Sequence, residues 1–252
     1  MIKKRLIGAV IVKNGWAVQS FGYNKYLPLG RPSILIKNLN RWGADEILVN
    51  VIDRSHKNLG PDYRLIEEIQ SLSLDTPLIY AGGINSLRHA EQVINQGADR
   101  IVLESIVEKN FNEFKKISNN IGSQSIIAGI PVTINEKKIF KYNYLNQRVE
   151  NFSKNWLKII SDNLVSEILV IDSVHEGYHD KFNVNLIEKF PSKKLKLICF
   201  GGITTKKLIS SISKYKNVSA IAVGNSLNFK EHSIQILKKE LSKNIFRKEF
   251  YY

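Results

Sequence analysis

Two glycine pairs occupy matching places in the sequence. Gly82-Gly83 and Gly201-Gly202 each follow a short apolar run and precede a segment with helical periodicity. Glycines leave backbone N–H groups accessible, and a helix N-terminus attracts anions, so both pairs are suited to binding phosphate. One apolar run later comes a polar residue, Ser105 after the first pair and Gly224-Asn225 after the second. A tight turn without a ligand is the alternative for one pair alone, but two matching pairs favour two phosphate sites.

Other polar side chains follow two further apolar runs, which end at Ile52 and Ile171. A histidine beside a carboxylate can move protons near neutral pH, so these groups are candidates for acid–base work. Solvated loop residues are the alternative. No spacing of His, Asp or Glu is typical of a metal site, and we expect neither a metal nor a cofactor. The candidate catalytic residues are Asp53, Asp172, His175 and Glu176.

These candidates lie at the ends of short apolar runs that alternate with amphipathic segments, a pattern typical of strand–helix units around a parallel sheet. The helical segments include 62–72, 87–96, 151–162 and 230–241. A chain of 252 residues fits an α/β fold with one (β/α)₈ TIM barrel. The eight predicted strands are Arg5–Val12, Glu46–Ile52, Pro77–Tyr80, Arg100–Leu103, Ser125–Val132, Glu167–Ile171, Leu195–Cys199 and Ala220–Val223.

The second half of the chain repeats the first. Glu46-Ile-Leu-Val returns at Glu167, and Ala81-Gly-Gly-Ile returns at Phe200, at offsets of 121 and 119 residues. A fixed period of this kind indicates an internal structural repeat. Because no linker interrupts the order, we predict a single domain over 1–252, built from half-barrels at about 1–122 and 123–245.

The composition indicates which kinds of partner and which cellular compartment to expect. The formal charge of +14 invites a nucleic-acid interpretation, but the lysines are scattered and lack interleaved aromatic residues. A solvated basic surface is the simpler explanation, and we expect no nucleic-acid partner. The first apolar run is too short to span a membrane, and Cys199 is the only cysteine, so we expect a cytoplasmic protein without a membrane partner.

The sequence resembles the cyclase subunit of imidazole glycerol phosphate synthase, a family of histidine biosynthesis. The resemblance spans almost the whole chain and depends on the order and spacing of short motifs. The motifs are Lys4-Arg5-Leu-Ile, Gly43-Ala-Asp-Glu46, Tyr80-Ala-Gly-Gly-Ile84, Gly122-Ser-Gln-Ser125, Glu167-Ile-Leu169 and Gly201-Gly202.

The resemblance implies a barrel that binds a bis-phosphorylated substrate at the C-terminal ends of its strands. It also implies a glutaminase (glutamine amidotransferase) partner at the opposite face, which sends ammonia through the barrel interior. Glu176-Gly177 matches a phosphate-contacting Asp-Gly of the family. The residues that match the gate of the family's ammonia channel are Arg5, Glu46, Arg100 and Glu167. The alternative for these four residues is an exposed cluster of salt bridges.

The catalytic end departs from the family pattern. The two aspartates that serve the cyclase as acid and base fall on Ile11 and Pro131, and two further polar positions fall on Gln19 and Val51. This looks similar to a divergent branch associated with amidation of surface-polysaccharide sugars. We therefore expect an ammonia-dependent synthase subunit acting on a phosphorylated sugar or nucleotide. The alternatives are the histidine-pathway cyclase subunit itself, or a non-catalytic barrel that channels ammonia or scaffolds a partner.

Overall fold

Eight parallel strands close into a barrel in the computed structural model, which describes residues 3–144 and 146–249. Each strand pairs with its neighbour in parallel register all the way round the barrel. The predicted (β/α)₈ barrel is confirmed, and every predicted strand is present with bounds shifted by at most three residues. The barrel strands are β1 (Arg5–Lys13), β4 (Glu46–Val51), β5 (Leu78–Ala81), β6 (Arg100–Leu103), β7 (Ile126–Asn135), β10 (Glu167–Asp172), β11 (Lys196–Phe200) and β12 (Val218–Val223).

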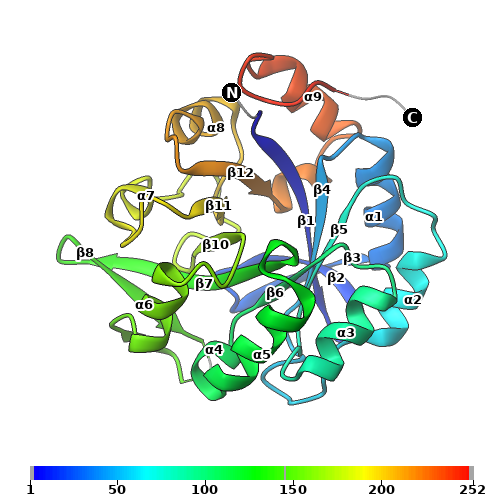
Figure 1. The fold of residues 1–252 in the computed structure, drawn as a ribbon. Helices are drawn as coiled ribbons and strands as arrows, with labels where there is room; N and C mark the ends of the chain where they lie inside the picture. Colours follow the sequence, from blue (N-terminus) through cyan, green and yellow to red (C-terminus); the bar gives the residue numbers. More distant parts are fainter. Residues whose placement is uncertain (1–2, 145, 250–252) are drawn as a thin grey trace.

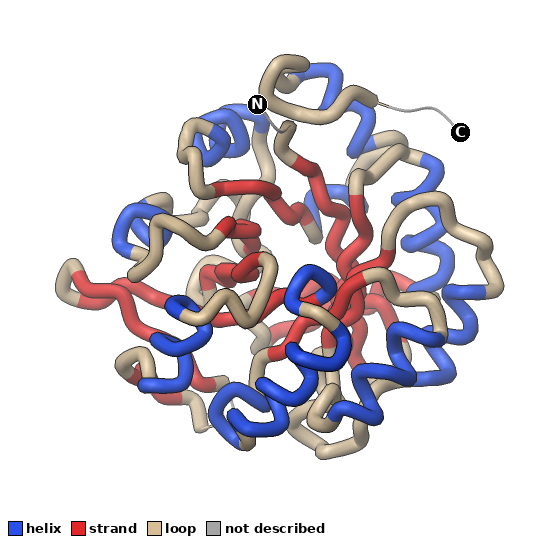
Figure 2. The backbone as a smooth tube through the Cα atoms, viewed as in Figure 1, coloured by secondary structure: helices blue, strands red, loops and turns tan. Residues whose placement is uncertain are grey.

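Helices surround the strands (Figures 1 and 2). Several begin at a side-chain cap: Ser86, for example, accepts a hydrogen bond from the backbone N–H of His89 and starts the helix after the first glycine pair. The helices are α1 (Pro32–Arg41), α2 (Tyr63–Gln70), α3 (Leu87–Asn95), α4 (Ile106–Lys109), α5 (Phe111–Ile121), α6 (Lys154–Ser161), α7 (Asn185–Lys189), α8 (Lys206–Ser213) and α9 (Ser233–Glu240), with 3₁₀ turns η1 (Ser123–Ser125) and η2 (Asn225–Asn228).

The barrel strands are buried on both faces, which explains why they read as continuous apolar runs. Alternate residues, such as Ile7, Leu48 and Leu169, pack together inside the barrel. The residues between them, such as Leu6, Ile47 and Ile168, pack outward against the helices. The interior is therefore a column of apolar side chains along the barrel axis.

Two antiparallel hairpins were not predicted. β2 (Trp16–Phe21) and β3 (Lys25–Gly30) follow β1, whereas β8 (Lys138–Asn143) and β9 (Arg148–Glu150) follow β7. Both extend from the C-terminal ends of barrel strands, where the glycine loops also lie. The hairpins therefore contribute to the walls of that end of the barrel.

The two ends of the described chain meet beside β1. The Lys4 backbone bonds to Ile245 and to Arg247, and the buried Lys238 ammonium lies 2.8 Å from an Asp45 carboxylate oxygen. This pair fastens α9 to the barrel. The outermost positions of the predicted 1–252 domain, 1–2 and 250–252, lie outside the described residues.

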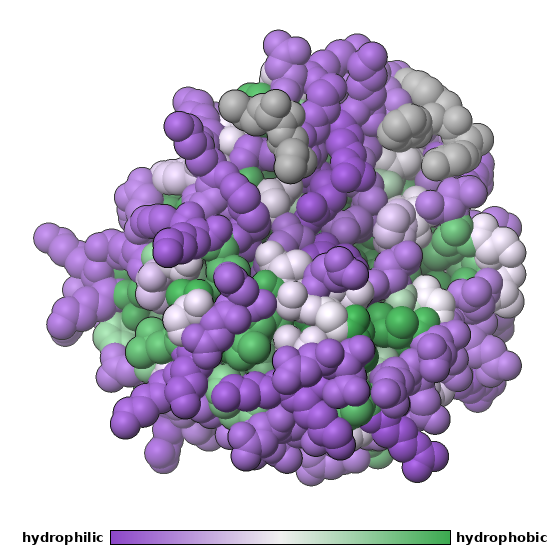
Figure 3. All heavy atoms as spheres, viewed as in Figure 1, coloured by the Kyte–Doolittle hydropathy of each residue, from purple (hydrophilic) through white to green (hydrophobic). Residues whose placement is uncertain are grey.

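Hydrophilic side chains cover most of the face drawn in Figure 3, with apolar ones between them. In the described ranges, 3–144 and 146–249, no helix is long and apolar enough to cross a membrane.

Candidate functional site

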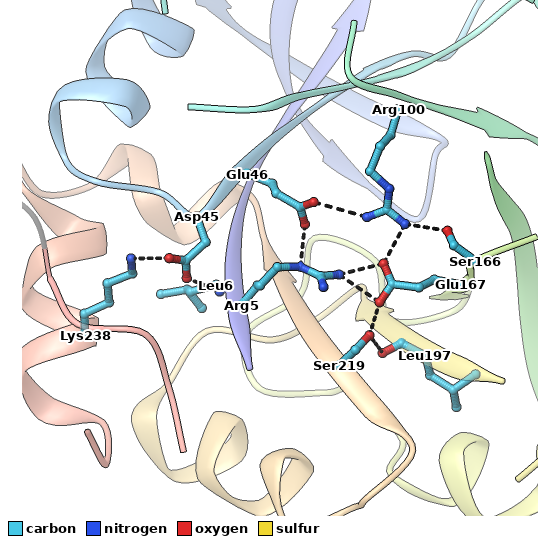
Figure 4. A network of polar contacts seen from close by, with 10 residues as sticks. All are labelled: Arg5, Leu6, Asp45, Glu46, Arg100, Ser166, Glu167, Leu197, Ser219 and Lys238. Atoms are coloured by element: carbon cyan, nitrogen blue, oxygen red, sulfur yellow. Dashed lines mark hydrogen bonds and ion pairs between the residues drawn. The ribbon is translucent and has the colours of Figure 1, made fainter. Parts of the chain in front are cut away.

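The four residues that match the family's channel gate form a closed ring at the N-terminal end of the barrel (Figure 4). Arg5 Nε lies 2.7 Å from Glu46, and Arg5 Nη2 lies 2.6 Å from Glu167. Arg100 completes the ring at 3.1 Å from Glu46 and 2.6 Å from Glu167. Each residue begins a barrel strand, so the charges alternate around the barrel axis. The predicted four residues are thus brought together as one interlocked set of ion pairs.

The ring is largely withdrawn from water. The two carboxylate side chains are only 7–8% exposed, and the arginines 14–17%. Burial alone would raise the pKa of Glu167, but Arg5 and Arg100 outweigh burial and hold that pKa below its usual range. The same contacts raise the pKa of Arg5 against the opposing effect of burial. Glu167 and Arg5 therefore carry their charges at neutral pH, which keeps their ion pair intact.

The apolar interior lies directly above the ring. On β6 the inward side chains are Arg100, in the ring, and Val102, in the inner apolar cluster. The same alternation carries Glu104, just beyond the strand, to the opposite mouth. At about 3.3 Å per residue, Arg100 and Glu104 lie about 13 Å apart along the strand. The interior thus separates a charged ring at one end from a polar cavity at the other.

A cavity of about 310 Å³ opens at the C-terminal ends of the first-half strands. Its walls come from the loops after β4, β5 and β6 and from both hairpins. Cationic and aromatic side chains share the lining with carboxylates, a mixture suited to a polar, ring-containing ligand. Its polar lining includes Lys13, Asn50, Asp53, Ser55, His56, Lys57, Glu104, Ser105, Gln147 and the tyrosines Tyr23, Tyr26, Tyr142 and Tyr144.

The first glycine pair lies in this cavity. Gly82, Gly83 and Ser105 all line it, and the Gly83 N–H donates to Ser55 Oγ at 3.1 Å. Gly83 has a φ of +72°, and a Cβ there would lie 2.1 Å from the Gly60 carbonyl oxygen, so only glycine fits. The glycine turn and the two serines Ser55 and Ser105 thus share one wall of the cavity, ahead of α3.

The second glycine pair lies in a separate and much smaller cavity of about 20 Å³, enough for one water-sized group. The structure brings its predicted members together: Gly177, Gly201, Gly202, Gly224 and Asn225 all line this space.

The β2–β3 hairpin contacts two of the loops that line this second cavity. The Asn225 amide donates to the Ser20 carbonyl oxygen at 2.8 Å. A Cβ on Gly177 would lie 1.8 Å from that same oxygen.

Three of the four candidate catalytic residues lie away from the larger cavity. The Asp172 carboxylate is buried and accepts bonds from the backbone N–H groups of His175 and Asn183 at 3.2 and 2.8 Å. His175 Nδ1 lies 2.9 Å from the same carboxylate. The pair shapes the loop after β10, and three donors from that loop already contact the Asp172 carboxylate.

Glu176 fastens the β2–β3 hairpin. Its carboxylate accepts from Ser20 Oγ at 2.8 Å and from the Tyr23 backbone N–H at 3.2 Å. Its carbonyl oxygen accepts from the Gly22 N–H at 2.8 Å. Burial raises the pKa of Glu176, and these hydrogen bonds oppose the rise.

Asp53 alone of the four lines the larger cavity. One of its oxygens pairs with Lys57 Nζ at 3.1 Å, and its other oxygen, Oδ1, is buried without a hydrogen-bond partner among the described residues. The positions that match the family aspartates are divided as well: Pro131 lines the larger cavity and Ile11 the smaller one.

Glu104 was not among the predicted site residues, yet it is the carboxyl that the barrel interior presents to the larger cavity. Burial raises the pKa of Glu104 to about 8, with Lys141 opposing the rise. Its signal in the sequence is the alternation Arg100, Val102, Glu104, which continues one residue past the strand end at Leu103. In the part of the chain that the structure describes, no group of three His, Cys, Asp or Glu side chains is placed to hold a metal.

The fold, the ring and the glycine loops together define a (β/α)₈ barrel with an ionic ring at one end and two glycine loops at the other. The family model described as histidine biosynthesis protein matches residues 5–233, and the chain belongs to this family. The imidazole glycerol phosphate synthase subunit HisF of Staphylococcus aureus strain MRSA252 is 27% identical over 96% of this chain and 97% of its own length. A Vibrio vulnificus protein provisionally named as the synthase subunit hisF2 is 26% identical over 96% of this chain and 89% of its own length.

Proposed function

We propose that this chain is the ammonia-receiving subunit of a glutamine-dependent synthase. The observation that carries the proposal is spatial: the ring, the apolar interior and the polar cavity follow one another along the barrel axis. An ammonium ion would lose its hydration in such an interior at high cost, whereas neutral ammonia can pass. The ring then serves as a gate that opens when ammonia is supplied.

The partner in this proposal is a glutaminase subunit that docks on the N-terminal face of the barrel. That face carries the ring, so ammonia released there would enter beside Arg5 and Glu46. The resemblance to the cyclase subunit and the names of the relatives support such a partner.

The proposed substrate is a phosphorylated small molecule bound in the larger cavity. Gly82, Gly83 and Ser105 would hold its phosphate, and the nearby Lys13 and Lys57 would supply positive charge. The second phosphate loop would hold the far end of a longer substrate. A single domain with half-barrels meeting near residue 122 fits this arrangement, with one phosphate loop in each half.

Two reactions suit such a subunit. The names of the relatives favour the imidazole glycerol phosphate synthase reaction of histidine biosynthesis. Ile11 and Pro131 favour the second candidate, amidation of a surface-polysaccharide sugar, because neither side chain can transfer a proton.

Rescue of a histidine auxotroph separates the two candidates. The chain would be expressed with a synthase-type glutaminase in a bacterium that lacks its own cyclase subunit. Growth without histidine supports the first candidate. Stimulated glutamine hydrolysis without growth supports the second, and absence of both results refutes the proposed function.

A further inference from the structure

We propose that Glu104 is the catalytic carboxyl of this barrel, transferring protons where the interior opens into the larger cavity. The assignment rests on the proposed function, because it requires ammonia to arrive through the interior. It places the proton chemistry on β6, whereas the family pattern places it at the positions of Ile11 and Pro131.

The first argument is position. Glu104 continues the inward alternation of Arg100 and Val102, and so stands above the ring on the same strand. Ammonia that passes the ring and follows the interior must pass beside this side chain before it meets a ligand in the cavity. A group that can give a proton to a leaving oxygen and take one from the new nitrogen is needed at that place.

The second argument is space. Gly129 pairs with the inward Leu169 and has no side chain to fill the barrel at its level. A Cβ built on Gly129 would lie 3.9 Å from Glu104 Oε2 and only 2.8 Å from a Val102 methyl carbon. The missing side chain therefore leaves room for the Glu104 carboxyl to lean toward the barrel axis.

The third argument is that this carboxyl is uncommitted. The carboxylates of Asp172 and Glu176 accept hydrogen bonds from backbone and hydroxyl donors. One Asp53 oxygen is paired with Lys57. Within the described ranges, the Glu104 carboxyl has neither a hydrogen bond nor an ion pair. Lys141, the cation that acts on it, is itself paired with Glu108 at 2.8 Å.

The surroundings set its protonation state. Lys141 approaches from β8. The charged and titratable groups that share the cavity with Glu104 are Lys13, Tyr23, Tyr26, Asp53, His56, Lys57, Tyr142 and Tyr144. Burial is the largest influence and raises the pKa of Glu104 to about 8. At pH 7 the acid form then exceeds the carboxylate by about ten to one, so Glu104 has a proton to give.

The proposed step is a substitution of oxygen by nitrogen. The ammonia lone pair forms a C–N bond to an electrophilic carbon of the phosphorylated substrate, and the bond from that carbon to its leaving oxygen breaks. Glu104 gives its proton to the leaving oxygen. The new nitrogen, now positively charged, returns one proton to the Glu104 carboxylate, which restores the acid form.

The protonation state is tested by carbon-13 NMR of the full chain with labelled glutamate carboxyls. A resonance absent from Glu104→Gln should titrate with a midpoint near pH 8. The matched control is Glu91→Gln, which removes an exposed carboxyl on α3 and should leave the Glu104 resonance unchanged. A Glu104 midpoint below pH 6 would overturn the proposal.

The catalytic role is tested by nitrogen transfer in the complex with the glutaminase. Glutamine labelled with nitrogen-15 at the amide would be supplied with a cell extract, and labelled products would be counted by mass spectrometry. Glu104→Gln should lower transfer at least 100-fold while glutamine hydrolysis stays within twofold of wild type. Glu104→Asp should keep part of the transfer, and Glu91→Gln all of it.

The outcomes separate the two proposals. Equal transfer by wild type and Glu104→Gln would overturn the role of Glu104 and leave the proposed function standing. No transfer by either protein would refute the proposed function, and the role of Glu104 with it. Loss of glutamine hydrolysis together with transfer in Glu104→Gln would assign Glu104 a structural role and overturn the proposal.

Discussion

Replacing Glu167 by glutamine should destabilise the barrel strongly. Glu167 receives Arg5 and Arg100 at 2.6 Å each, and its side chain is 7% exposed. The neutral isostere leaves two buried guanidiniums sharing the single charge of Glu46. Removing one partner of a buried ion pair costs about 3–5 kcal/mol, and we expect a loss of that size in the free energy of unfolding at pH 7.

The pH dependence of this loss provides an internal check. The folded-state pKa of Glu167 is lowered because the two arginines outweigh burial. Its contribution to stability is therefore present above the unfolded-state pKa, about 4.5, and disappears as the pH falls through the folded-state value. The difference between wild type and Glu167→Gln should accordingly shrink below about pH 4.5.

Urea unfolding followed by circular dichroism measures both effects. The exposed substitution Glu91→Gln is the control and should change the free energy of unfolding by less than about 0.5 kcal/mol. A loss below about 1 kcal/mol for Glu167→Gln at pH 7 would refute the reasoning, since that is the value of a solvated surface pair.

Three further predictions concern the face of the barrel at the C-terminal ends of its strands. Between pH 5 and 9 the wild type should lose about 2–5 kcal/mol more stability than Glu104→Gln, because a folded-state pKa near 8 makes ionisation in this window costly; urea unfolding across the range measures it. Ser20→Ala removes a buried hydrogen bond to Glu176 and should cost about 1–3 kcal/mol, with faster proteolysis of the β2–β3 hairpin. Gly83→Ala would force a Cβ against Gly60 and should abolish binding of inorganic phosphate, measured by phosphorus NMR.

Each of these has an outcome that would contradict it. Parallel stability curves for wild type and Glu104→Gln would mean that Glu104 ionises as freely as a surface carboxyl. Unchanged proteolysis of Ser20→Ala would mean that the Asn225 contacts alone hold the hairpin. Phosphate binding that survives in Gly83→Ala would place the anion elsewhere.

The barrel could be predicted from the sequence because strands buried on two faces leave continuous apolar runs, whereas the hairpins could not. β3 is largely exposed and contains Pro28, and β8 mixes lysines with apolar residues. Neither has the burial that produces a periodic signal, so both resemble ordinary connections.

The candidate site was predicted in part. The ring residues begin their strands, so the strand pattern and the resemblance together located Arg5 and Glu167. The carboxylates in the loops could not be placed in this way, because the sequence does not show which hydrogen-bond donors will surround a carboxylate oxygen. Asp172 and Glu176 follow the right strand, yet backbone and hydroxyl donors take up their oxygens. Glu104 was missed because the predicted strand ended one residue before it.

Glutamine hydrolysis by a synthase-type glutaminase, measured with and without this chain, tests the ammonia-receiving role most directly. We predict a stable complex and faster hydrolysis than by the glutaminase alone, with the coupling disturbed by Arg5→Ala and by Glu46→Ala but not by Glu91→Gln. The contradicting result is the absence of both complex and stimulation with every such glutaminase, which would leave a phosphate-binding barrel without an ammonia source.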